Sequence, residues 1–309
     1  MNYLKPLVGG LPVLLLLVLV ASCVPATSPV ITSEAANTSD PPNNSPWEII
    51  LQQKIEQPLR VAAFFNESFG LTGGPSDVGQ AYLTADGGDT WIKTENSADC
   101  LFSLDIVDHQ VAWQCSLGPI RVSTDGAQTW QAVTDYGNYC RQLSFLDAET
   151  GWLAASNQLG MTTNGGQTWE AIPLPEGVQD IAAISLQTST GGYLLDIAGV
   201  FYITQDKGQS WSSHPLALGL GDNTLPNHET AAAAVRFLDA DHGLVVVHLV
   251  DSLPSKVVAL RTADGGQTWT QENVITAPLL VSLYLSHDGS TLTMVDKMAS
   301  QVTVLRYLE

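Results

Sequence analysis

The phrase TADGGDTW at residues 84–91 decides the fold, because four further versions of it follow along the chain. They read STDGAQTW at 123–130, TTNGGQTW at 162–169, TQDKGQSW at 204–211 and TADGGQTW at 262–269. The third positions are Asp86, Asp125, Asn164, Asp206 and Asp264, so successive copies are separated by 39, 39, 42 and 58 residues. A period near 40 residues is typical of repeat arrays, with β-propellers among the main candidates.

The residue types of this eight-residue repeat predict a tight β-hairpin with a structural role. A Ser or Thr hydroxyl at the first position and the Asp or Asn at the third can bind backbone groups inside a turn. Glycine provides the left-handed backbone that such turns need. The closing tryptophan is large and apolar, and we expect it to wedge between neighbouring sheets. These tryptophans are Trp91, Trp130, Trp169, Trp211 and Trp269.

The repeat resembles the Asp-box of the bacterial neuraminidase repeat. Asp-box hairpins decorate β-propellers that include sialidases, sortilin-type receptors and the photosystem II stability/assembly factor family. The segments LSFLDAETGWLAAS at 143–156 and VRFLDADHGLVVV at 235–247 are most similar to the photosystem II assembly factor family. The resemblance covers roughly residues 46–309. It implies an all-β propeller that binds another protein without catalysing a reaction.

Alignment of the repeats on their turns predicts six blades. The units begin near Leu59, Cys100, Arg141, Ile181, Ala233 and Leu280. The sixth has no eight-residue repeat and lacks a fourth strand, but Trp47–Ile50 copies the stretch that follows each repeat. We therefore expect this N-terminal strand to complete the last blade and remove an exposed sheet edge. A seventh blade, as is usual in the photosynthetic family, would require two blades within 212–261. We instead expect one blade there, with a long polar loop at 219–229.

The N-terminus has the pattern of a lipoprotein signal peptide. An apolar run at 11–21 ends in Val20-Ala21-Ser22-Cys23, which resembles a bacterial lipobox. We expect cleavage after residue 22, lipid attachment at Cys23 and a flexible tether over 23–45, followed by the propeller over 46–309. A transmembrane anchor and an ordinary signal peptide are the alternatives. The lipobox interpretation predicts an extracytoplasmic, membrane-anchored lipoprotein of the bacterial cell envelope.

Charge and cysteine content restrict the partners and the compartment. The net charge is −19, which argues against nucleic acid as a partner. An oxidising compartment permits a disulfide. Cys100 could pair with Cys140 or with Cys115, and the sequence does not choose between them.

The sequence contains few candidate metal-binding or catalytic residues. Its six histidines form neither H-x-H nor H-E-x-x-H, so we expect no metal site, no cofactor and no catalytic residue. A Ca²⁺ at Asp239, Asp241 and His242 is an alternative, although turn chemistry already explains those residues.

Candidates for partner binding lie on the propeller face opposite the eight-residue repeats, because loops on a rigid scaffold usually carry binding. They are Arg60, Arg141, Asp222 and His228. The two arginines begin inner strands near the channel mouth, and an alternative role for them is to neutralise an acidic rim. The competing function is a sialidase-like propeller that binds or hydrolyses glycans, which would need arginines converging at the channel mouth beside a Tyr–Glu pair.

Overall fold

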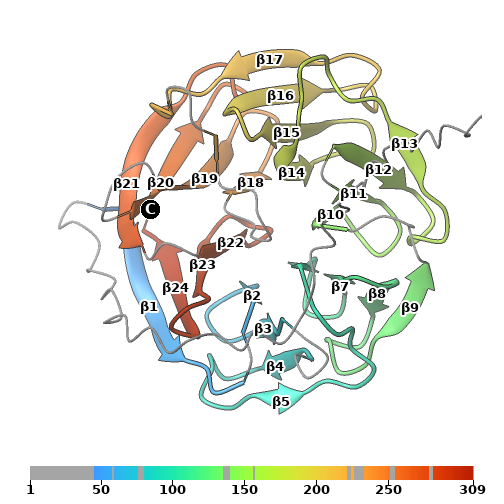
Figure 1. The fold of residues 1–309 in the computed structure, drawn as a ribbon, viewed down its shortest axis with the longest axis vertical. Helices are drawn as coiled ribbons and strands as arrows, with labels where there is room; N and C mark the ends of the chain where they lie inside the picture. The colour runs from blue at the N-terminus through green and yellow to red at the C-terminus, as the bar shows by residue number, and fades with distance from the viewer. Residues whose placement is uncertain are drawn as a thin grey trace, which may run out of the picture.

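The computed structural model describes residues 45–57, 59–75, 80–134, 140–155, 157–220, 224–225, 233–250, 255–277 and 281–308. Within these ranges the chain forms strands and no helix, and the strands assemble into six four-stranded antiparallel sheets. The sheets stand around a central axis like the blades of a propeller (Figure 1). The predicted all-β, six-bladed propeller is confirmed, and residues 212–261 hold strands of two successive blades rather than an additional one.

Each blade runs outward from the axis in chain order. Blade one contains β2 (Val61–Phe64), β3 (Gly70–Gly73), β4 (Tyr82–Thr84) and β5 (Ile92–Lys93). Blade two contains β6 (Ser103–Ile106), β7 (Ala112–Cys115), β8 (Ile120–Ser123) and β9 (Gln131–Thr134). Blade three contains β10 (Gln142–Phe145), β11 (Gly151–Ala155), β12 (Gln158–Thr162) and β13 (Glu170–Ile172).

The second half of the ring repeats this order. Blade four contains β14 (Ile181–Leu186), β15 (Gly192–Asp196), β16 (Val200–Thr204) and β17 (Ser212–Pro215). Blade five contains β18 (Ala233–Phe237), β19 (Gly243–Leu249), β20 (Ser255–Thr262) and β21 (Thr270–Ala277). Blade six contains β22 (Val281–Leu285), β23 (Thr291–Asp296), β24 (Gln301–Tyr307) and, on its outside, β1 (Trp47–Lys54).

The N-terminal strand closes the ring, as predicted. β1 pairs antiparallel with β24 from Trp47 opposite Tyr307 to Lys54 opposite Gln301, with one irregularity between Ile49 and Leu51. Figure 1 shows the blue β1 lying along the red β24 at the rim. Because β1 covers β24, the outer strand of blade six is supplied by a segment some 250 residues earlier in the sequence.

A Phe–Gly contact explains the phrases that precede the repeats. In three blades the inner strand ends in Phe and the second strand begins with Gly, and a Cβ on that Gly would approach the ring within 3 Å. The pairs are Phe64 with Gly70, Phe145 with Gly151 and Phe237 with Gly243, at 2.7, 2.3 and 2.5 Å. A larger residue at these glycines would displace the buried ring, so the close approach of the backbone requires glycine.

The hydrophobic core lies between blades, and one tryptophan joins each interface. Each repeat tryptophan packs in the apolar cluster between its own blade and the preceding blade. Blade six has no repeat hairpin, and Trp47 at the start of β1 takes the corresponding place in the cluster between blades five and six. Six interfaces thus receive six aromatic anchors, which bury large apolar surfaces.

The side chains of the repeats bind the backbone of their own hairpins. In the first copy, Thr84 Oγ1 accepts a hydrogen bond from Gly88 N–H (2.8 Å) and donates to Asp86 Oδ1 (2.8 Å). Asp86 also accepts from the Thr90 N–H (2.9 Å) and hydroxyl (2.6 Å). Asp125, Asp206 and Asp264 make the same contacts in their copies. Asn164 Oδ1 accepts the Thr168 N–H at 3.0 Å, and its Nδ2 lies 2.8 Å from Thr168 Oγ1.

A disulfide joins Cys115, at the end of β7, to Cys140, just before β10. Neither pairing considered from the sequence included these two cysteines together, so both expectations for the bond are wrong. The reason is geometric: the second strand of blade two ends beside the chain entering blade three, with the two Cα atoms 5.6 Å apart. Cys100 lies buried in the same region, with Arg60 Nη1 3.6 Å from its sulfur.

The long insertion after β17 is less polar than expected. Leu225 is 1% exposed, its N–H donates to the Ile197 carbonyl (2.7 Å), and it packs with Leu216 and Leu218 between blades four and five. The predicted polar loop at 219–229 thus contains one buried apolar residue, Leu225, whose burial anchors the insertion to blade four. In the described part of the chain, no helix is long and apolar enough to cross a membrane.

Candidate functional site: the central channel and its two ends

The up-and-down order of the strands sorts the connections onto two faces of the ring. Turns between first and second strands share a face with the repeat hairpins, which we call the turn face; the remaining connections form the loop face. Hydrogen bonds confirm that the turn face is shared, since an N–H of a repeat hairpin donates to a carbonyl in the turn between the first and second strands of the same blade. Examples are Gly87 N–H to Ser68 O (2.9 Å) and Gly265 N–H to Asp241 O (2.9 Å). The channel connects the two faces.

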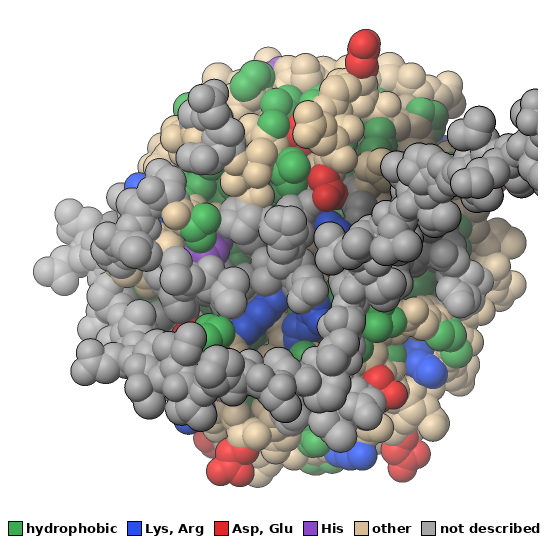
Figure 2. All heavy atoms as spheres, viewed as in Figure 1, with side chains coloured by type: hydrophobic (Ala, Val, Ile, Leu, Met, Phe, Trp, Pro, Cys, Tyr) green, Lys and Arg blue, Asp and Glu red, His purple; other side chains and the backbone are tan. Residues whose placement is uncertain are grey.

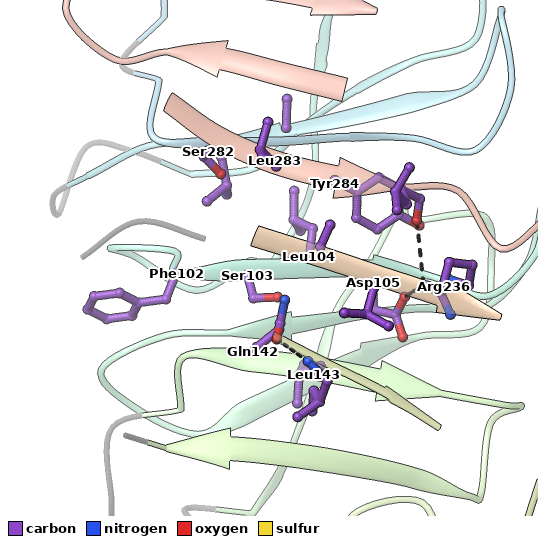
Figure 3. A pocket seen from close by; sticks show the side chains of 16 residues that line it. Phe102, Ser103, Leu104, Asp105, Gln142, Leu143, Arg236, Ser282, Leu283 and Tyr284 are labelled. Atoms are coloured by element: carbon purple, nitrogen blue, oxygen red, sulfur yellow. Dashed lines mark hydrogen bonds and ion pairs between the residues drawn. The ribbon is translucent and has the colours of Figure 1, made fainter. Parts of the chain in front are cut away.

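The inner strands of all six blades line a narrow pocket in the channel (Figure 3). Its volume is about 30 Å³, which is room for one or two water molecules. Its polar lining residues include Ser103, Gln142 and Ser282, and its charged ones are Asp105 and Arg236. Among the described residues that line it, Asp105 alone carries a carboxylate and Arg236 alone carries a guanidinium.

Asp105 lies at the centre of a buried charge cluster. Its Oδ1 is 3.4 Å from Arg236 Nη2 and 3.3 Å from His287 Nε2, and its Oδ2 accepts the Phe145 N–H at 2.6 Å. The side chain of Asp105 is 1% exposed and that of His287 is 20% exposed. Four blades therefore meet at one carboxylate, which links the ring across its axis.

The partners of Asp105 hold it in its charged form. Burial raises the pKa of Asp105, but the charges of His287 and Arg236 and the Phe145 N–H outweigh burial, so the pKa is lowered overall. Burial also raises the pKa of Tyr284, and the nearby charge of Asp105 adds to this rise. Tyr284 Oη accepts the Ile106 N–H at 3.2 Å and lies 3.3 Å from the Ile106 carbonyl. Tyr284 is therefore a neutral phenol that ties blade six to blade two.

This cluster lies toward the turn face of the channel. Asp105 and Arg236 each occupy the last-but-one position of an inner strand, and His287 lies in the turn after β22. None of these three residues was predicted from the sequence as a site residue. The available signal was a single charge inside an otherwise apolar inner strand, as in SLDI and AAVRF, because charged groups are almost never buried without a partner.

The two predicted arginines lie near the loop face, at the starts of inner strands. Arg60 precedes β2 and is 7% exposed, with its guanidinium 4.1 Å from the centroid of the Phe102 ring. Arg141 precedes β10, its side chain is 37% exposed, and its Nη1 lies 3.3 Å from Asp180 Oδ2. The positions are equivalent, since each backbone N–H donates to a carbonyl of the second strand, Gly73 O (2.7 Å) for Arg60 and Ala154 O (2.8 Å) for Arg141.

Asp222, His228 and Cys23 lie outside the described residues. On the face drawn in Figure 2, Lys and Arg side chains gather near the centre of the ring. The structure thus places two arginines at the loop-face end of the inner strands, and a separate third arginine, Arg236, inside the channel.

The acidic turn of blade five, with Asp239, Asp241 and His242, is the candidate Ca²⁺ site of the sequence. Asp239 Oδ1 accepts the N–H groups of Asp241 (2.8 Å) and His242 (2.7 Å), and Asp239 Oδ2 lies 2.9 Å from His242 Nδ1. These bonds lower the pKa of Asp239 to about 2, with the His242 N–H as the largest cause. Across the described ranges, no group of three or more His, Cys, Asp or Glu side chains is arranged to hold a metal ion. The Asp239 carboxylate therefore accepts hydrogen bonds from the backbone of its own turn.

Comparison with solved structures finds propellers of different activities. YCF48 bound to D1 peptide aligns at 16% identity and a TM-score of 0.50, covering 87% of this chain and 99% of that chain. The WD40 β-propeller domain of Doa1 aligns at 13% identity and a TM-score of 0.52, covering 84% and 96%. An ancestral GH74 enzyme aligns at 12% identity and a TM-score of 0.49, covering 78% of this chain and 35% of the enzyme. At these identities the likeness shows the fold alone.

Sequence comparison gives no further relative. No protein-family model matches the chain, and a search of curated proteins finds no match.

Proposed function

We propose that this protein is a non-catalytic propeller that binds another protein through its loop face, outside the cytoplasm, in the manner of a photosystem II assembly or stability factor. The observation that carries the proposal is the state of the channel. Among the described residues that line the channel pocket, the one carboxylate is already bound by Arg236, His287 and the Phe145 N–H, and the volume of this pocket is about 30 Å³. Because these ion pairs fill the channel pocket, we expect a partner to bind to the loops instead.

Glycoside hydrolysis fits this channel poorly. Most glycosidases place two carboxyl groups about 5–10 Å apart on either side of the scissile bond. Asp105 is the one carboxylate among the described lining residues, and a sugar ring does not fit a space sized for one or two waters. The residues around Tyr284 also differ from a sialidase site, because its charged neighbours are Asp105, Arg236 and Asp288 rather than a Glu and several arginines.

The loop face suits a polypeptide partner. Arg141 is 37% exposed beside its partner Asp180, and in a chain of net charge −19 it offers a cationic contact to an acidic segment. The neighbouring disulfide, Cys115–Cys140, fixes the backbone directly before Arg141. YCF48, which shares the fold, is seen bound to a D1 peptide, and this supports a protein or peptide as the ligand class.

The cellular location belongs to the same proposal. Lipid attachment at Cys23 would tether the propeller to a membrane through residues 24–45, with the signal peptide 1–22 removed. The Cys115–Cys140 disulfide supports an oxidising compartment outside the cytoplasm. The hydrogen-bonded repeat hairpins support the assignment of the five repeats as Asp-boxes with a structural role.

Partner capture from membranes of the host organism tests the proposal. Arg141→Gln should reduce capture, because it removes an exposed cation from the loop face. Lys207→Gln is the matched control: it removes the same charge from an exposed position in a repeat hairpin on the turn face. Undiminished capture by Arg141→Gln would move the interface away from the loop face. Turnover of sialosides or other glycosides by the parent protein would instead favour the glycan hypothesis.

A further inference from the structure

A second pocket, of about 340 Å³, opens on the turn face between blades five and six. It is ten times larger than the channel pocket and falls in the size range of small-ligand sites. We call it the seam pocket. Its lining residues are Leu238, His242, Gly243, Leu244, Arg261, Thr262, Ala263, Thr270 and Gly289.

The seam pocket lies where the ring lacks a repeat hairpin. In the five other interfaces the hairpin of the following blade leans on the preceding blade. A Cβ on Gly208 would meet Ile172 of blade three at 2.1 Å, and one on Gly266 would meet Phe201 of blade four at 2.8 Å. In blade six no turn joins β24 to β1; their ends meet instead through the Leu308 N–H and the Pro46 carbonyl (2.6 Å). The turn-face edge of blade five therefore lacks the hairpin cover that the other interfaces have.

The sequence of blade five differs at the position that faces this gap. The residue directly before each repeat is apolar in the first four blades and packs in the interface that the next hairpin covers. These residues are Leu83, Val122, Met161 and Ile203. The equivalent residue in blade five is Arg261, whose guanidinium carbon lies 3.3 Å from the centroid of the Tyr307 ring. An arginine thus replaces the apolar residue in the blade whose neighbour lacks the hairpin.

The charged groups in the lining of the pocket are basic. Among its described lining residues are Arg261 and His242 and no carboxylate, although each of the two has a carboxylate beside it, Glu272 for Arg261 and Asp239 for His242. Arg261 Nε forms an ion pair with Glu272 Oε2 at 3.7 Å, which is longer than a hydrogen bond, and among the described residues the buried Nε and Nη2 have no hydrogen-bond partner. Leu238, Leu244 and Ala263 supply an apolar wall beside these groups. A guanidinium stacked on Tyr307 is held in place to bind a carboxylate.

We propose that the seam pocket binds a tight turn from a partner polypeptide, with a carboxylate of that turn on Arg261 and its apolar part against Leu238 and Leu244. A peptide turn is the occupant because a turn of the chain fills the corresponding place in the five other interfaces. A carboxylate is its charged group because arginine here replaces the apolar residue of the other blades. The site is on the face opposite the proposed loop-face interface, so the two can be occupied independently.

A head-to-tail cyclised peptide containing TADGGDTW serves as the probe, and the same peptide with Asn in place of both Asp residues serves as the uncharged control. Titration calorimetry with the full chain measures both. Arg261→Met installs the residue found at the equivalent position of blade three, and should weaken binding of the acidic probe about tenfold or more. Arg306→Met is the matched variant: it removes the same charge from blade six, where Arg306 pairs with Glu48 and Glu67. It should bind like the parent.

His242→Gln is a second, milder change in an exposed lining residue. It should lower the affinity for the acidic probe less than Arg261→Met does. Thermal unfolding of each variant shows that it is folded. Three results would each overturn the proposal. The first is equal affinity for the two probes. The second is equal affinity of Arg261→Met and the parent. The third is no binding of either probe by the parent chain.

Discussion

Trp47 and Tyr307 face each other as the first pair of the ladder that closes the ring, with ring centroids 5.3 Å apart and planes at 71°. This edge-to-face contact joins the start of β1 to the end of β24. Trp47 is 2% exposed and fills the place that a repeat tryptophan fills in the other interfaces. The closing contact is therefore also a core contact between blades five and six.

Replacing Trp47 by Ala should lower the free energy of unfolding by about 3–5 kcal/mol, because it leaves a large cavity in this core. Urea denaturation followed by tryptophan fluorescence of the remaining residues measures the change. Trp47→Phe keeps most of the volume and should cost less. An Ala variant as stable as the parent would mean that β1 is dispensable for closure.

The repeat hairpins should make stability sensitive to acid. The Thr268 hydroxyl and N–H lower the pKa of Asp264 from 3.8 to about 2. Because the folded pKa is depressed, the contribution of this carboxylate is present above pH 4 and is lost as the pH falls through about 2. Asp264→Asn imitates the third repeat, which carries Asn164, and should unfold with a shallower dependence on pH in this window. Identical profiles for parent and variant would contradict the assignment.

The disulfide should stabilise the junction of blades two and three. Its cysteines are separated by 25 residues, and removal of a bond that closes such a loop costs roughly 2–4 kcal/mol. The double variant Cys115→Ser, Cys140→Ser should therefore have a lower unfolding midpoint in urea. A double variant with the midpoint of the oxidised parent would show that packing alone fixes this junction.

Asp105→Asn should destabilise the ring by roughly 3–5 kcal/mol, because it leaves the charge of Arg236 buried without its partner. Replacing both residues together, Asp105→Asn with Arg236→Met, should recover part of this loss in a double-mutant cycle. Additive losses would mean that the two side chains do not interact in solution.

Membrane attachment should depend on Cys23. We expect Cys23→Ala to abolish lipid attachment, so that the variant no longer fractionates with detergent-soluble membrane protein. Immunoblots of the fractions, with the Ser45→Ala variant as a control that leaves the lipobox intact, test this prediction. A variant processed and retained like the parent would disprove lipid anchoring at this residue.

Local patterns predicted most of the architecture, because each blade repeats the same short-range chemistry. Glycine, aspartate and tryptophan at fixed spacing define the hairpins, and Trp47 repeats the residue that ends each of them. The charge cluster was not foreseen, because Asp105 is 131 residues from Arg236 and 182 from His287, and no local pattern brings them together. The pairing of Cys140 with Cys115 and the burial of Leu225 were missed for a related reason: Cys140 and Leu225 lie in connections, where the neighbouring blade decides what is buried.

The position of β1 fixes the order in which this protein can complete folding. β1 is made before every other strand of the ring, yet its partner β24 is made after all of them. Until then β1 presents an unpaired edge that can add to other chains. Contacts between such distant segments form slowly, because the loop they close is long. We therefore expect the last step of folding to be the joining of two chain ends, and nascent or truncated chains to depend on chaperones until it occurs.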